Sequence, residues 1–386
     1  MNRHGSSLAP AHTLDDENLL EEILLRLPPQ PSSLPRTSRV CKRWQTILYD
    51  PKFPSRFRKN HQKPPLLGFF ATHFGMDPVF TTVLDKPDHI PAARFSVPQK
   101  YVQSKQCRLM GCRHGLAILI NGYQRQVIVW DPLTGQQHRM PFPLGLCGDG
   151  MGSSWRCHAA VLCVDAEYGH MHGDCYLSPF RLVLISSGRN KTFACLYESA
   201  SGLWANIVSM VTSNVILGTS PSILMWNVVY WLLDGGDILV FDIERQTLGV
   251  IEKPARSTSW SFQLLKTHDG TGLVFGVLSK LSLHLWERKI SSDGVVRWVL
   301  QQEIQLEEMF PHIMPRDDKW VYFVGYDEDT NVIVLSTRIG NFMLQLESMH
   351  IKKISEPDNA CLVFYPYTNF FTAGREDGWK WLELKF

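Results

Sequence analysis

The sequence predicts a multidomain protein in which a small all-α unit of three helices precedes an all-β propeller of about six blades. Two observations lead to this prediction. Apolar residues recur at helical spacing up to about residue 50, whereas later short β-branched and aromatic runs alternate with Gly, Pro, Asn and Asp turns. A chain of 386 residues, 44% of them hydrophobic, is long enough to bury a core in each part.

The helical unit is expected over residues 14–53, after a disordered stretch at residues 1–13. Its first helix starts at Asp16 and carries apolar side chains at helical spacing: Leu20, Ile23, Leu24 and Leu27. A second helix begins at Ser32, and a third carries Val40, Cys41, Trp44 and Leu48 before Pro51. Three short helices cannot bury all of these side chains, so we expect a partner to cover part of their surface.

Residues 54–65 are predicted to be a basic linker, because arginines and lysines accumulate there and Pro64-Pro65 closes the stretch. The wider basic segment comprises Arg36, Arg39, Lys42, Arg43, Lys52, Arg56, Arg58, Lys59 and Lys63. It has no motif that reads nucleic acid, so complementarity to an acidic protein partner is favoured over phosphate binding.

The propeller is expected over residues 66–386 because one strand and turn pattern repeats. Val127–Gly135 is expected to form a strand followed by a turn that begins at Asp131, and Ile238–Gln246 shows the same order of strand and turn. Asp242 and Glu287 are 45 residues apart, which is the spacing of propeller blades. A pair of β-sandwiches would explain the strands, but not the recurring turn.

Two parts of this region receive specific predictions. The glycine-rich residues 144–174 are interpreted as an inserted loop or extended hairpin rather than a blade. Residues 379–386 alternate like a strand, so we expect them to close the ring by pairing with Leu66–Phe70.

Charge and cysteine content limit the class of protein. Lysine and arginine number 39 against 37 aspartate and glutamate residues, and this balance excludes a general coat for nucleic acid or an anionic membrane. No apolar run reaches the roughly 18 residues of a membrane span. Nine cysteines without a regular spacing fit free thiols in a reducing compartment, so we expect an intracellular protein of the nucleus or cytoplasm.

No motif of the sequence supports enzyme chemistry or a cofactor. A group of metal-type side chains has spacings that match no structural zinc pattern: Cys157, His158, Cys163, His170, His172 and Cys175. His114, beside Gly115, is interpreted as a structural histidine. A P-loop, a nucleophile elbow and a paired-histidine zinc helix are all missing from the sequence. We therefore expect no catalytic residue, no metal and no cofactor.

The N-terminal residues resemble the F-box motif of plant F-box proteins. The shared features are the run from Leu14 to Pro28, the box Val40-Cys41-Lys42-Arg43-Trp44, and the close at Asp50-Pro51. The remaining chain is similar to the F-box-associated β-propeller of cereal members, through Gly111–Leu116, Val129–Pro132 and Tyr230–Asp234. Pro35 departs from the usual pattern, and we expect a short second helix that starts there.

The resemblance implies a non-catalytic role as substrate adaptor of an SCF-type (Skp1-cullin-F-box) E3 ubiquitin ligase. It implies that the F-box binds a Skp1-type adaptor, and through it a cullin-RING ligase, while the propeller binds an unknown protein substrate. The residues expected to bind the adaptor are Leu14, Leu20, Ile23, Leu24, Leu27, Pro28, Leu34, Val40, Cys41, Trp44 and Leu48. Two alternatives stay open: an F-box protein that binds Skp1 without degrading a client, and a propeller enzyme of the kelch or oxidase kind.

Overall fold

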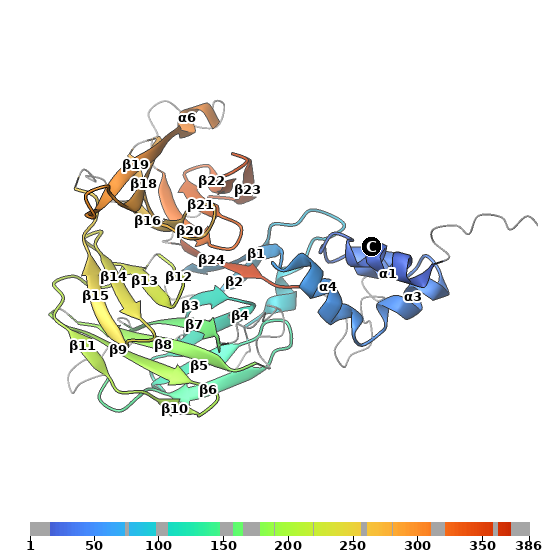
Figure 1. Cartoon of the computed structure of the whole chain (residues 1–386), viewed down its shortest axis with the longest axis horizontal. Coiled ribbons are helices and arrows are strands. Elements are labelled where there is room, and N and C mark those ends of the chain that lie inside the picture. The colour runs from blue at the N-terminus through green and yellow to red at the C-terminus, as the bar shows by residue number, and fades with distance from the viewer. Residues whose placement is uncertain are drawn as a thin grey trace, which may run out of the picture.

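The computed structural model describes residues 16–73, 77–97, 107–146, 157–164, 178–188, 190–218, 220–255, 261–279, 281–309, 321–357 and 362–371. Figure 1 shows a helical unit at one side of a ring of β-sheets. The helices come from the N-terminal part of the chain, and nearly all later elements are strands. The predicted fold class, a small all-α unit followed by an all-β propeller, is confirmed.

The helical unit contains four helices in the described residues instead of the predicted three: α1 (Glu17–Leu25), α2 (Ser33–Thr37), α3 (Lys42–Leu48) and α4 (Phe53–His61). The additional helix α4 lies where the basic linker was expected. Phe53 and Phe57 are one turn apart on α4 and both are buried, and Pro54 occupies its first turn, where proline is tolerated. The apolar pair makes this stretch a helix in spite of its charge. A short α2 does form around Pro35, as expected.

The described strands form five sheets. We divide the seven-stranded sheet at its single parallel pair, between β20 and β24, and so describe the ring as six blades in chain order. Blade 1 contains β3 (Cys107–Arg113), β4 (Leu116–Asn121), β5 (Gln126–Trp130) and β6 (Gln137–Pro141). Blade 2 contains β7 (Cys157–Cys163), β8 (Phe180–Ser187), β9 (Thr192–Glu198), β10 (Leu203–Trp204) and β11 (Val208–Met210). Blade 3 contains β12 (Ile223–Met225), β13 (Val228–Leu232), β14 (Ile238–Asp242) and β15 (Thr247–Ile251).

The later blades follow the same order. Blade 4 contains β16 (Ser261–Lys266), β17 (Leu273–Ser279), β18 (Ser282–Ile290) and β19 (Val296–Gln305), and the short helix α6 (Leu306–Met309) follows it. Blade 5 contains β20 (Tyr322–Asp327), β21 (Val332–Thr337), β22 (Gly340–Gln345) and β23 (Ile351–Ser355). Blade 6 contains β24 (Leu362–Thr368), β1 (Leu66–His73) and β2 (Val79–Thr82), and the 3-10 helix η2 (Ala92–Phe95) follows β2 along the chain.

The ring closes by pairing the two ends of the β region. β24 pairs antiparallel with β1, so strands almost 300 residues apart share blade 6. The first partner of this pairing, Leu66–Phe70, was expected; the second partner is β24, and residues 379–386 lie outside the described residues. Blades 5 and 6 also touch at one parallel pair, Gly325 with Phe364. A Cβ on Gly325 would lie 2.5 Å from the Phe364 carbonyl oxygen, so only glycine fits there.

One sequence interpretation needs correction. Residues 144–174 were expected to form an insertion, yet they contain β7, a strand of blade 2 in which every residue is buried. The run Cys157–Cys163 lacks the polar alternation of a half-exposed strand because it is covered on both faces. Residues 147–156 and 165–174 lie outside the described residues.

Apolar side chains fill the spaces between neighbouring blades. Along β13, Trp231 packs into the cluster shared with blade 2, whereas the next residue, Leu232, packs into the cluster shared with blades 4 and 5. This alternation is the period of two that a strand imposes on its side chains. Blade 3 is therefore packed against a neighbouring blade on each of its two faces.

Candidate functional site

The first candidate site is the apolar surface of the helical unit, and α1 shows how it arises. The Asp16 side chain caps this helix by accepting a hydrogen bond of 2.8 Å from the Asn18 amide. Leu20 and Leu24, one turn apart, are fully buried. Leu19 and Ile23, also one turn apart, keep 45% and 41% of their surface exposed. α1 therefore has one apolar face inside the unit and a second one in solvent.

A similar division follows in the connection between α2 and α3. Leu34 and Leu48 are buried, whereas Val40 is 61% exposed and Cys41 is exposed beside it. Trp44 is half-buried against the core cluster of the unit. Tyr49, directly after α3, is 42% exposed. A branched aliphatic side chain as exposed as Val40 adds to the apolar surface that this small unit leaves open to solvent.

The eleven residues expected to bind an adaptor thus fall into separate groups. Those that the structure leaves accessible are Ile23, Leu27, Pro28, Val40, Cys41 and Trp44, and Leu14 lies outside the described residues. Those that belong to the internal core are Leu20, Leu24, Leu34 and Leu48. For these last four the contact with an adaptor stays a prediction, and in the free chain their side chains are covered by the unit's own core.

Apolar side chains from α4 and from the ring also belong to this core. Phe53, Phe57 and Phe370 complete the core cluster of the helical unit, and Phe370 follows β24 in blade 6. The Phe57 and Phe370 rings meet edge to face at a centroid distance of 6.5 Å. The Ser32 amide also donates a 2.7 Å hydrogen bond to Asp88, and the Asn369 amide donates to the Pro65 carbonyl. Helical unit and ring are therefore packed together rather than tethered by a linker (Figure 1).

The exposed apolar residues lie in a basic part of the chain. Residues 16–63 contain ten lysines and arginines but only five aspartates and glutamates. Arg56 forms an ion pair with Glu21, and Arg58 is buried, whereas Arg39 and Lys42 are exposed on either side of Val40 and Cys41. A partner that covers Val40 would therefore meet positive charge around an apolar centre, which favours an acidic partner surface.

The second candidate site is a buried group of charged residues at the centre of the ring, the central hub, formed by Arg113, Lys266 and Glu328. The Arg113 Nε donates to Glu328 at 2.5 Å, and the Lys266 Nζ lies 3.0 Å from the other carboxylate oxygen. The Leu224 amide donates to the same oxygen at 3.0 Å. These side chains keep between 7% and 17% of their surface exposed, so the charges are paired in a mostly dry environment.

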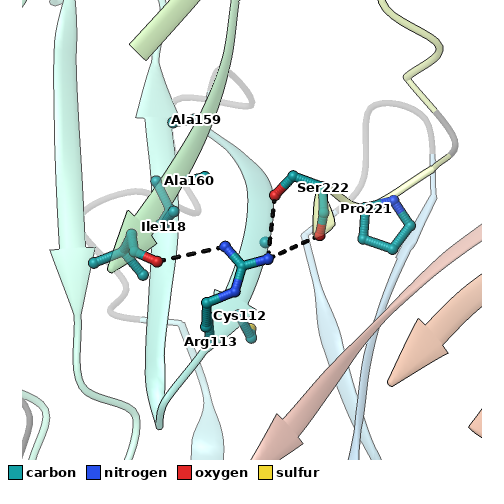
Figure 2. Close-up of a pocket in the computed structure, with 9 residues that line it drawn as sticks. Cys112, Arg113, Ile118, Ala159, Ala160, Pro221 and Ser222 are labelled. Atoms are coloured by element: carbon teal, nitrogen blue, oxygen red, sulfur yellow. Dashed lines mark hydrogen bonds between the residues drawn. The ribbon is translucent and has the colours of Figure 1, made fainter. Parts of the chain in front are cut away.

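The hub connects every blade of the ring. Arg113 belongs to blade 1, and its guanidinium also donates to the Val161 carbonyl of blade 2 and, at 2.8 Å, to the Ser222 carbonyl just before blade 3 (Figure 2). Lys266 and Glu328 come from blades 4 and 5. Asp329 then accepts a hydrogen bond from Thr368 of blade 6. The adjoining cavity has a volume of about 20 Å³, enough for one water molecule and too small for a ligand.

The hub also changes the pKa values of its acids. Burial raises the pKa of Glu328, but Arg113 and Lys266 outweigh it and lower that pKa to about 2. Burial, with Asp329 beside it, raises the pKa of Asp327 to about 7. Glu328 is therefore held as a carboxylate, and its neighbour in the chain is held close to protonation. The charges of Arg113, Lys266 and Glu328 are paired with one another inside the ring.

The described cysteine and histidine residues of the predicted metal-type group do not form a metal site. Cys157, His158 and Cys163 lie on β7, whereas His170, His172 and Cys175 lie outside the described residues. Burial, with Arg108 nearby, lowers the pKa of His158 to about 3, so this imidazole is neutral. Across the described part of the chain, no group of three or more metal-type side chains is placed to hold an ion. His114 lies in the turn between β3 and β4, at a φ of 54°.

Comparisons with known proteins agree with this architecture. Residues 15–56 match the F-box domain family, and residues 108–370 match the family described as F-box protein AT5G49610-like, beta-propeller. The chain belongs to this F-box protein family. F-box proteins of this architecture typically act as substrate adaptors of SCF ligases, in partnership with Skp1 and a cullin-RING ligase, and they are typically not enzymes.

Two curated relatives and one solved structure give the range of similarity. The chain is 22% identical to F-box protein At5g03970 of Arabidopsis thaliana over 79% of its own length and 72% of the relative. It is 25% identical to F-box protein At5g07610 of the same plant over 65% of its length and 60% of the relative. The crystal structure of BamB from Moraxella catarrhalis is 13% identical, with a TM-score of 0.31 over 74% of this chain and 73% of that one. The likeness to BamB is too slight to support an argument. In the described residues of this F-box protein, no helix has the length and apolar character needed to cross a membrane.

Sequence reasoning overlooked Leu19 and Tyr49 as exposed apolar residues. The signal for Leu19 was available, because Leu19 and Ile23 are four residues apart, as are the buried Leu20 and Leu24. Two adjacent apolar rows on one helix exceed what a single core contact can cover. For Tyr49, which lies just beyond α3, no comparable periodicity was present.

Proposed function

We propose that this F-box protein is the substrate-recognition subunit of an SCF-type E3 ubiquitin ligase, with its helical unit on a Skp1-type adaptor and its ring on a client protein. The observation that best supports this proposal is the exposed Val40 at 61%, next to exposed Cys41 and between Arg39 and Lys42. Ile23 and Leu19 on α1 add exposed apolar surface to the same unit. An apolar centre with a basic rim suits an acidic adaptor.

The physical role of such a subunit is to raise effective concentration. A client held on the ring, near a ubiquitin-loaded enzyme, meets the reactive thioester as though both belonged to one molecule. The packed contact between Phe57 and Phe370 supports this role, because it fixes the orientation of the ring relative to the helical unit. The protein then needs no acid, base or nucleophile of its own.

The test is capture of a purified Skp1-type adaptor by the full-length chain and by Val40→Arg and Ile23→Arg. Each substitution would bury an unpaired charge in the interface, so we expect capture to weaken at least tenfold. Both positions are exposed, so the unfolding temperature should stay unchanged. Tyr123→Arg is the matched control, because Tyr123 lies on the ring and is 82% exposed.

Adaptor capture that is unchanged in both helical-unit variants would contradict the proposal. The non-degradative alternative is tested in cells with the same Val40→Arg variant. If the protein delivers its client for degradation, Val40→Arg should hold the client without delivering it and should raise the client level. A client that stays bound, but whose level and ubiquitylation do not respond to this variant, would favour the non-degradative alternative.

A further inference from the structure

The outer edge of blade 4 differs from the outer edges of the other blades. Its last strand, β19, has ten residues, and eight of them are exposed. The outer strands of the other blades are shorter, at five residues in β6, two in β10, five in β15, five in β23 and four in β2. β6 also ends in Pro141, and β23 carries Lys352 and Lys353, both of which discourage pairing with another strand. A long, exposed edge is unusual in a natural sheet unless another strand uses it.

Among the described strands, β19 pairs only with β18, so one set of its backbone groups has no partner strand. The Ser291 amide donates to the Val295 carbonyl, so residue 295 points toward β18. In an antiparallel ladder, the backbone N–H and C=O groups of successive residues point alternately toward and away from the partner strand. Those of Arg297 and Val299 therefore point inward, to β18. Those of Val296, Trp298 and Leu300 point outward, away from β18. A register shift between Leu285 and Trp286 interrupts the ladder after Leu300. The usable edge is therefore Val296–Leu300, with three outward N–H groups and three outward carbonyls.

The three outward residues all carry apolar side chains, which share one face of the strand. Val296 is 43% exposed and Leu300 is 42% exposed. Trp298 between them is held in place, because its indole N–H donates to the Glu252 carbonyl at 2.8 Å and its ring packs on Phe275. At the tip of the hairpin, Ile290 is 75% exposed. The edge thus offers a fixed aromatic side chain flanked by open aliphatic ones.

We propose that the Val296–Leu300 edge of β19 binds an extended segment of the client protein by β-strand addition. The proposal rests on the proposed function, since it assigns the place where the client is held. Only another extended backbone has donors and acceptors at the spacing of this edge, so the occupant is a strand. Its side chains next to Val296, Trp298 and Leu300 are apolar, of the β-branched or aromatic kind.

The charges beside the edge add one further requirement on the client segment. Arg297 is 56% exposed at its side chain and makes an ion pair with Asp293, and exposed Arg288 and Lys289 lie on the neighbouring strand. Lys289 is already paired with Glu287. An acidic residue at the hairpin end of the client segment would gain from Arg297, because an exposed pair such as Arg297 with Asp293 exchanges readily. The client segment is therefore apolar and alternating, with acid near that end.

The test uses a display library of random decapeptides, selected in parallel on the full-length chain and on Leu300→Pro and Leu300→Lys. Proline removes one outward N–H, and lysine keeps it but places a charge in the docking row. We expect alternating apolar peptides with an acidic residue to be enriched on the parent chain and to bind at least tenfold more weakly to both variants. Val250→Lys on β15 is the matched control, since Val250 is 43% exposed and Leu300 is 42% exposed.

Hydrogen exchange on the parent chain with the enriched peptide then locates the binding. The outward amides of Val296, Trp298 and Leu300 should exchange at least tenfold more slowly, with those of Arg297 and Val299 unchanged. Peptides that bind the Leu300 variants as well as the parent, or that protect another strand, overturn the proposal. A dimer of the parent chain that Leu300→Lys dissociates would assign the edge to a second copy and also overturn it.

The same preparations separate this proposal from the proposed function. Adaptor capture reports on the helical unit, whereas peptide binding reports on β19. Loss of peptide binding in the Leu300 variants with no adaptor capture by the parent would leave the docking edge standing and remove the ligase role. Adaptor capture without any peptide protection of β19 would do the reverse.

Discussion

The helical unit and the ring of this F-box protein differ in how their apolar cores are built. The helical unit has one small apolar cluster, and Phe370 from the ring completes it. The ring has apolar clusters between neighbouring blades and a polar hub where the inner strands meet. The smaller part therefore takes one of its core residues from the larger part, whereas the ring is closed on itself by β1 and β24. Exposed apolar surface remains on the small part because it has too little volume to hide it.

The largest effect that separates the two parts should come from Glu328→Gln. This change leaves Arg113 and Lys266 buried without their counter-charge, and breaking a buried pair in this way costs about 3–5 kcal/mol. The loss should appear in the free energy of unfolding of the ring, measured in denaturant. Glu303→Gln is the control, because the Glu303 side chain is 47% exposed and its removal should cost no more than about 0.5 kcal/mol.

The pH profile of the same two proteins sharpens this prediction. The pKa of Glu328 is lowered to about 2, so its carboxylate stabilises the parent above its ordinary pKa of 4.5, and this contribution is lost as pH falls from 4.5 through 2. Glu328→Gln should lack that part of the acid destabilisation. A parent and variant that lose stability in parallel below pH 4.5 would show that Glu328 does not carry the pairing.

The second effect should come from Phe370→Ala and should fall on the helical unit. Phe370 is 2% exposed, and removing a buried phenylalanine costs about 3 kcal/mol or more. Hydrogen exchange of the α1 amides should accelerate by about a hundredfold, which corresponds to roughly 3 kcal/mol. The matched control is Phe371→Ala, one residue later and 5% exposed, because Phe371 packs against Phe95 in the ring. If Phe371→Ala loosens α1 as much as Phe370→Ala does, the dependence of the helical unit on Phe370 is not specific.

What sequence could predict follows the same division between local pattern and long-range contact. The short β-branched and aromatic runs and the recurring Asp-headed turn are local, and they were enough to predict an all-β propeller. α4 was missed because its charge outweighed the spacing of Phe53 and Phe57 in the interpretation. β7 was missed because glycines surround a run that is buried on both faces.

The hub and the shared core could not be predicted from any local window. Arg113 and Lys266 are the last residues of β3 and β16, Glu328 directly follows β20, and only the closed ring brings them together. In the same way, Phe370 is one aromatic among many until β24 places it against Phe57. Leu20 and Leu24 share their core cluster with this residue, which lies about 350 positions away, and no local window of the sequence shows that neighbour.

The smallest effect should come from the polar contact between the two parts. The Ser32 amide donates to the Asp88 carboxylate at 2.7 Å, so Asp88→Ala removes a charge-assisted hydrogen bond of about 1–2 kcal/mol from the boundary. The Ser32 amide should exchange about tenfold faster, while the amides of α1 should change little, because Phe370 still fills their core. Asp85→Ala is the control, since Asp85 pairs with Lys352 within the ring and its side chain is 84% exposed. Adaptor capture should be retained in both variants. A loss of capture in Asp88→Ala alone would mean that the orientation of the helical unit, and not only its exposed apolar surface, determines how the adaptor binds.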